Sequence, residues 1–160
     1  MLGFAGFCGR HFFALLVIVV LACVAWTVAY FALLFWATVS GGGIGGPLAY
    51  PAGLLFAAVA TVAAGIAFFL PSTRFAEWFA RRRGLPILAQ IPISLVCLGV
   101  LCLILVGVVQ ANRQEPFAIK TFLGWTAFLI GIQLLPLGIY WWIAQAGPLA
   151  MSVLRRFRRK

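Results

Sequence analysis

The sequence has very few acidic residues and only one histidine. Glu77 and Glu115 are its two carboxylate side chains, against twelve lysines and arginines, and His11 is its one imidazole. Acid–base catalysis and metal binding usually need paired carboxylates or a cluster of imidazole, carboxylate and thiolate groups. The two glutamates flank different apolar runs and fall on opposite sides of the membrane proposed below. We therefore expect no catalytic residue, no metal site and no cofactor, and we expect that the chain is not an enzyme.

The four cysteines also lack the spacing of a metal site or of a disulfide framework. Cys97 and Cys102 are five residues apart, which puts them on different faces of one helix, and the sequence has no CxxC motif. A thiol in an apolar helix usually behaves as a small hydrophobic side chain. We expect no redox function for these cysteines.

Apolar residues are what the sequence has in excess. They make up 65% of the chain, charged residues make up 9%, and the mean hydropathy is +1.14. A soluble globular domain needs far more polar surface, whereas a membrane-spanning helix needs about 20 apolar residues. The sequence therefore predicts an all-α integral membrane protein, with one four-helix transmembrane domain over residues 1–160. The expected spans run from about 12–39, 52–70, 85–109 and 121–144.

The basic residues gather on one side of these spans and predict the topology. The loop between the third and fourth spans carries Arg113 and Lys120, while ten other basic residues fall on the opposite side. Basic residues favour the cytoplasmic side, so we expect both termini to be cytoplasmic in a bacterial cytoplasmic (inner) membrane. The net charge of +10 is then explained by topology, and we expect no binding of nucleic acid.

The stretch 71–86 is the longest polar interruption of the apolar sequence. Pro71 cannot continue a helical hydrogen-bond ladder, and the Ser-Thr pair after it is typical of a helix N-cap. We predict a short amphipathic helix over 73–83 that lies in the membrane interface and ends at Gly84. Within it Glu77 precedes Arg81 by four residues, the favourable order for an ion pair on a helix.

Small residues on the spans predict where helices pack together. Alanines recur at three- and four-residue steps on the first two spans, which predicts a tight antiparallel hairpin. Glycines recur every seven residues on the fourth span and predict a groove for a neighbouring helix. The expected packing residues are Ala25, Ala29, Ala60, Ala64, Gly124, Gly131 and Gly138.

None of the four expected spans has an interior Asp, Glu, Lys, Arg or His, the groups that usually mark intramembrane chemistry. The intramembrane polar residues that remain are Gln90, Ser94 and Gln133. They either join helices by hydrogen bonds or line a path for a neutral or weakly polar solute. We favour hydrogen bonding between helices, because so few polar residues make a poor pore.

Exposed arginines and lysines near the membrane surface favour contact with anionic lipid headgroups or with an acidic partner. A basic tail, residues 148–160, ends the chain. The expected contact residues are Arg81, Arg82, Arg83, Arg155, Arg156, Arg158, Arg159 and Lys160.

Two functions remain open. The first is a non-catalytic integral subunit that packs, anchors or helps to assemble a larger membrane complex with other membrane protein subunits. The second is a homo-oligomeric channel or carrier for a neutral or weakly polar solute. A membrane-disrupting effector is a third hypothesis that the basic tail permits but does not favour.

Overall fold

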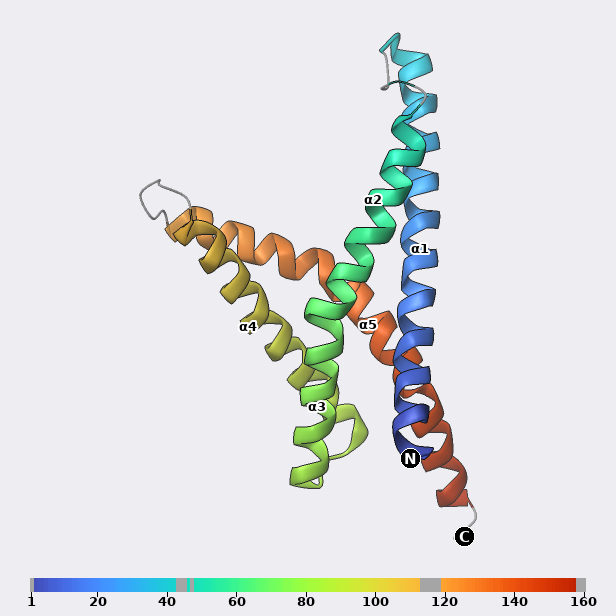
Figure 1. Ribbon diagram of the computed structural model, residues 1–160, viewed down its shortest axis with the longest axis vertical. Coiled ribbons are helices and arrows are strands. Elements are labelled where there is room, and N and C mark those ends of the chain that lie inside the picture. The colour runs from blue at the N-terminus through green and yellow to red at the C-terminus, as the bar shows by residue number, and fades with distance from the viewer. Residues whose placement is uncertain (1, 43–45, 47, 113–118, 158–160) are drawn as a thin grey trace.

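The computed structural model describes residues 2–42, 46, 48–112 and 119–157, and among these the side chains between residues 8 and 146. Within this part of the chain the fold is helical, with no strand. The α-helices are α1 (Leu2–Ser40), α2 (Ala49–Ala64), α3 (Leu70–Arg83), α4 (Gln90–Ala111) and α5 (Ile119–Phe157) (Figure 1). A π-helical turn, Gly65–Phe69, joins α2 to α3, and a 3₁₀ turn, Ile87–Ala89, precedes α4.

The expected all-α fold with four spans is confirmed. Four helical segments are long and apolar enough to cross a membrane, and each contains most of one expected span. Their limits are Cys8–Ser40, Ala49–Arg83, Ile87–Ala111 and Ile119–Ala146.

The predicted break at Pro71 is wrong. The helix runs from Ala49 to Arg83, so the segment 73–83 is the end of a long helix and not a separate short one. Thr73 does not cap a new helix, because its hydroxyl donates to the carbonyl oxygen of Phe69 at 2.8 Å. The wide π-helical turn directly before Pro71 explains the continuity, since extra room there relieves the clash between a proline ring and the preceding turn.

Gly84 ends the helix as the sequence predicts. Its φ of 63° is in the left-handed region, which glycine adopts without strain. The amide N–H of Leu85 then donates to the carbonyl oxygen of Ala80 at 2.9 Å, which satisfies one of the helix's last carbonyl groups. The chain can therefore reverse here between α3 and α4.

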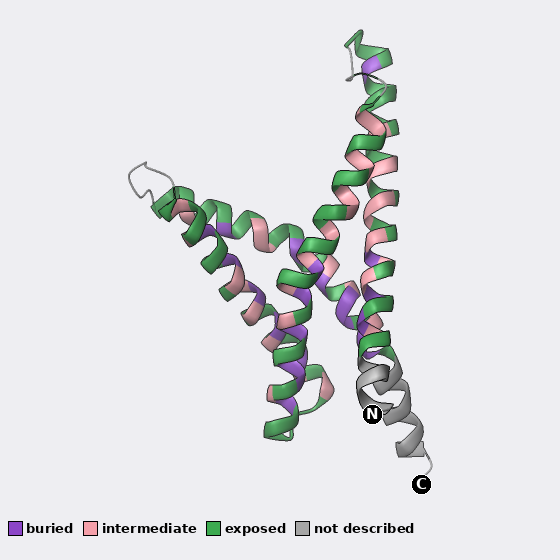
Figure 2. Cartoon of the chain, in the orientation of Figure 1, coloured by how far each residue is buried: buried purple, intermediate pink, exposed green. Residues whose placement is uncertain are grey.

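The helices meet at one end of the molecule and diverge at the other (Figure 1). The start of α1, the end of α5 and the connection between α3 and α4 lie at one end, called the terminal end below. The α1–α2 and α4–α5 hairpins separate toward the opposite end, called the loop end. Buried residues concentrate where the hairpins cross and toward the terminal end (Figure 2). The core there consists of Ala14, Ile18, Phe69, Leu98, Cys102, Leu137, Tyr140 and Ala144.

The predicted α1–α2 hairpin is present, but glycines make its closest contacts. A side chain on Gly53 would place its Cβ 2.0 Å from the Trp26 ring, and one on Gly65 would lie 2.2 Å from Leu15 Cδ1. The Trp26 indole N–H also donates to the carbonyl oxygen of Tyr50 at 3.3 Å. Large side chains of α1 therefore pack directly onto glycine backbone of the second helix.

The alanines predicted to pack this hairpin are placed differently. Ala25, Ala29 and Ala60 are exposed, and Ala64 is partly buried. Ala25, Ala60 and Ala64 do not make a close contact between the helices. Their short side chains line an open space between α1, α2 and α5.

We expect Gly53→Val to destabilise the hairpin by about 1–3 kcal/mol, because the new side chain must displace the Trp26 indole. Equilibrium unfolding in detergent micelles measures this change. The neighbouring Ala52 is exposed, so Ala52→Val serves as the control and should be nearly neutral. Equal stability of the two variants would contradict this account of the packing.

Candidate functional site

The most unusual group in the molecule is the buried carboxylate of Glu77. It lies on the face of α3 turned toward the other helices, and its side chain is only 3% exposed. Glu77 and His11 both lie outside the four expected spans, yet each side chain is only 3% exposed. The helix Ala49–Arg83 is about 50 Å long, against about 30 Å for the hydrocarbon core. Glu77 is near its end, beyond the expected second span.

Three donors surround this carboxylate. Arg10 Nη2 on α1 lies 3.2 Å from Glu77 Oε1, and Arg81 Nη2 lies 2.8 Å from Oε2. The side-chain amide of Gln145 on α5 donates to Oε1 as well. A desolvated carboxylate is very costly unless it is paired and hydrogen-bonded, so these contacts draw α1, α3 and α5 together. The predicted Glu77–Arg81 ion pair is confirmed.

His11 and Tyr140 extend the polar cluster into the core. His11 Nε2 lies 3.9 Å from Glu77 Oε1, and its Nδ1 shares a hydrogen bond of 2.8 Å with the Tyr140 hydroxyl. The Tyr140 ring packs in turn against Phe69, with 5.7 Å between ring centroids. We call Arg10, His11, Glu77, Arg81, Tyr140 and Gln145 the Glu77 cluster.

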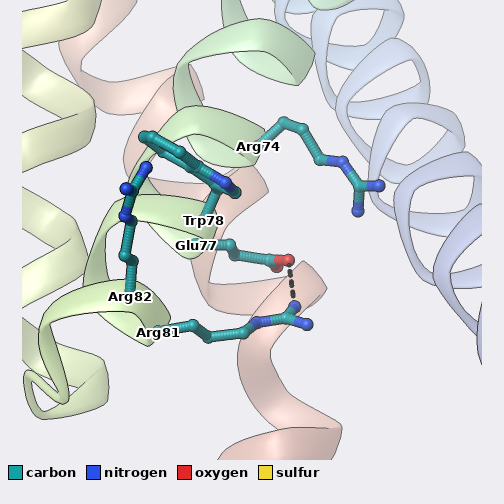
Figure 3. A pocket seen from close by; sticks show the side chains of 5 residues that line it. All are labelled: Arg74, Glu77, Trp78, Arg81 and Arg82. Atoms are coloured by element: carbon teal, nitrogen blue, oxygen red, sulfur yellow. Dashed lines mark hydrogen bonds and ion pairs between the residues drawn. The ribbon is translucent and has the colours of Figure 1, made fainter.

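A cavity of about 550 Å³ opens beside the cluster, lined by Arg74, Glu77, Trp78, Arg81 and Arg82. Figure 3 shows Glu77 and Arg81 meeting in their ion pair, while Arg82 lies against the Trp78 ring. Three arginines against one carboxylate make this cavity positive. It therefore favours an anionic group.

The three predicted intramembrane polar residues lie in different surroundings. Gln90 is buried and lines a second cavity, of about 370 Å³, that also borders Glu77. Ser94 is buried and donates to the carbonyl oxygen of Ile91 at 2.8 Å, within its own helix. Gln133 is buried on α5 and lines an apolar cavity formed by α1, α2 and α5. Among the described residues, no hydrogen bond joins any of the three to another helix.

The predicted glycine groove on α5 faces away from the rest of the chain. Gly124, Gly131 and Gly138 are exposed, and a Cβ built on each would meet nothing within 4 Å in the described structure. These glycines are therefore not used for packing within the chain.

The predicted lipid contacts are placed only in part. Arg81, Arg82 and Arg83 are exposed at the end of α3. The side chains of Arg155 and Arg156 fall outside the described ones, and Arg158, Arg159 and Lys160 lie outside the described residues.

Sequence reasoning missed four members of the cluster: Arg10, His11, Tyr140 and Gln145. One signal was available, because an isolated glutamate on a helix between apolar runs must find partners when it is buried. The sequence offers several arginines as partners, and only the packing of α1 and α5 selects among them. Gln145 carried no signal of its own, since it lies just beyond the expected fourth span.

Comparison of the chain with protein-family models, curated proteins and solved structures finds no match. Within the described part of the chain, no three His, Cys, Asp or Glu side chains come together as metal ligands. What the cluster does directly is neutralise one carboxylate with groups from three helices.

We expect Glu77→Gln to lower the free energy of unfolding by about 3 kcal/mol, because it removes the buried carboxylate that pairs with Arg10 and Arg81. Equilibrium unfolding in micelles provides the measurement. Arg81 is 70% exposed, so Arg81→Gln is the control and should cost no more than about 1 kcal/mol. If Glu77→Gln and Arg81→Gln lower the free energy of unfolding equally, the Glu77 carboxylate does not stabilise the fold as a buried, paired charge.

Proposed function

We propose that this chain is a non-catalytic integral membrane subunit that packs against other subunits and helps to assemble a larger membrane complex. The observation that carries the proposal is the exposed glycine face of α5, formed by Gly124, Gly131 and Gly138. Lipid gives helices no hydrophobic reason to associate, so small residues that let backbones approach closely become important. We assign this face to a transmembrane helix of another subunit.

The position of this face on α5 supports the assignment. Gln133, Leu137 and Tyr140 are buried against the rest of the chain. At about 100° of rotation per residue, they lie on roughly the opposite side of the helix from Gly131. One side of α5 therefore holds the chain together, while the glycine side is left for a neighbour.

The Glu77 cluster complements this arrangement. It ties α1, α3 and α5 together at the terminal end through Arg10 and Gln145. The hairpins diverge at the loop end, where most of their surface is exposed (Figure 2). A subunit fixed at one end and open at the other presents long apolar faces to its neighbours.

The proposal includes an orientation. We place the terminal end on the cytoplasmic side of a bacterial inner membrane, with both termini inside, because Arg74, Arg81, Arg82 and Arg83 lie toward that end. Anionic headgroups there would meet the arginine-lined cavity beside Glu77.

The rival function, a homo-oligomeric channel or carrier, has less support. It requires Gln90, Ser94 and Gln133 to line one path. Gln90 and Gln133 line separate cavities, and the Ser94 hydroxyl donates to the carbonyl oxygen of Ile91 in the same helix. A homo-oligomeric channel would therefore need several copies of the chain arranged in a ring, with Gln133 of each copy facing the central axis.

Native mass spectrometry of the tagged protein, extracted gently from its host membrane, tests the proposal. We expect other polypeptides to accompany the chain in a fixed ratio. Gly131→Leu should reduce their recovery about tenfold, because a bulky side chain keeps the partner helix at a distance. Leu123→Phe adds volume at another exposed position of the same helix and serves as the matched control, with recovery unchanged.

Two results would contradict the proposal. If only multiples of 17.3 kDa are found, the chain associates with itself and the rival function gains support. If partners are present but Gly131→Leu and Leu123→Phe behave alike, the glycine face is not where they bind.

A further inference from the structure

The apolar cavity between α1, α2 and α5 is a second feature that the packing of the chain leaves open. It has a volume of about 360 Å³ and is lined almost wholly by apolar side chains. The alanines Ala22, Ala25, Ala60 and Ala64 form one wall, where longer side chains would have filled the space. All of the lining residues are uncharged, so the cavity suits an uncharged occupant.

The cavity contains one amide that lacks a hydrogen-bond partner. Gln133 is only 8% exposed, and its Oε1 accepts no hydrogen bond from any described residue. Thr61, the other polar residue in the lining, already donates to the carbonyl oxygen of Ala57 at 2.7 Å. An unpaired buried amide is costly, more so where no water is available to compensate it. The unpaired Gln133 Oε1 therefore indicates a ligand that supplies a polar group.

The depth of Gln133 restricts what that ligand is. Gln133 lies at the centre of the candidate span Ile119–Ala146, far from both headgroup layers. A phospholipid keeps its polar part at the surface and can offer only an acyl chain at this depth. A small lipophilic molecule with one neutral polar group can bring that group to the middle of the bilayer.

The volume of the cavity suits a small molecule. Small-molecule sites are about 300–1,000 Å³, and this cavity falls at the lower end of that range. A ring with a short alkyl chain is a suitable occupant.

We propose that this cavity is a binding site for an uncharged lipophilic molecule that carries a hydroxyl group on a ring, as in a membrane-soluble phenol, whose O–H donates to Gln133 Oε1. The Gln133 amide holds that polar group, since a primary amide both donates and accepts hydrogen bonds. The alkyl part lies against the alanine wall. The site is separate from the glycine face of α5 and does not depend on the proposed assembly function.

The test compares 4-octylphenol with octylbenzene, which differs only by lacking the hydroxyl. The full-length protein is placed in nanodiscs of one phosphatidylcholine, and bound ligand is measured by native mass spectrometry at fixed ligand-to-lipid ratios. We expect the wild-type chain to bind the phenol about tenfold more tightly. Gln133→Met, which keeps the side-chain length without the amide, should bind the two compounds equally.

Two further variants complete the test. Thr126 is buried on the same helix but does not line the cavity, and its hydroxyl donates to the carbonyl oxygen of Phe122. Thr126→Val should therefore keep the preference for the phenol. Ala60→Phe fills the cavity and should abolish binding of both compounds. Equal binding of the two compounds by the wild-type chain would overturn the proposal and indicate an acyl-chain site. Persistence of the preference in Gln133→Met, or of binding in Ala60→Phe, would overturn it as well.

Discussion

The buried carboxylate of Glu77 constrains how the helices can be arranged, because a desolvated charge must keep its partners wherever the chain folds. Those partners come from α1, α3 and α5, so neutralising one group fixes three helices at the terminal end. His11 and Tyr140 then connect the carboxylate to the aromatic core around Phe69. The apolar spans supply little specificity of their own, since lipid solvates their exposed faces as well as protein does.

The consequence is an asymmetric molecule. Polar contacts define the terminal end, whereas the loop end depends on side chains such as Trp26 packing onto glycine backbone. Between these regions the hairpins leave both an exposed glycine face on α5 and an apolar cavity beside Gln133. The described side chains of the chain fill neither feature. This is the physical basis for the two proposals, another subunit on the glycine face and a small lipophilic molecule in the cavity.

The sequence predicts the number of spans, the hairpin, the stop at Gly84 and the Glu77–Arg81 pair, because each depends on local composition or spacing. The sequence does not predict that the helix continues through Pro71. The π-helical turn before Pro71 begins at Gly65, where Leu15 of α1 packs, and this contact between distant parts of the chain cannot be seen in local sequence. Nor does the sequence identify Arg10 and Gln145 as partners of Glu77, because that choice depends on how α1 and α5 cross. Periodicity alone cannot distinguish an alanine face that packs from one that lines a cavity.

At the terminal end, the Glu77 carboxylate holds α1 and α5 together. Pulsed electron paramagnetic resonance tests it directly, with spin labels at the exposed positions Phe12 and Trp142 in a chain whose native cysteines are replaced. With Glu77 present we predict a narrow distribution of distances between the labels, and with Glu77→Gln a broader distribution shifted to longer distances. A narrow distribution that is unchanged by Glu77→Gln would contradict the claim, and would mean that apolar packing alone holds these helices in place.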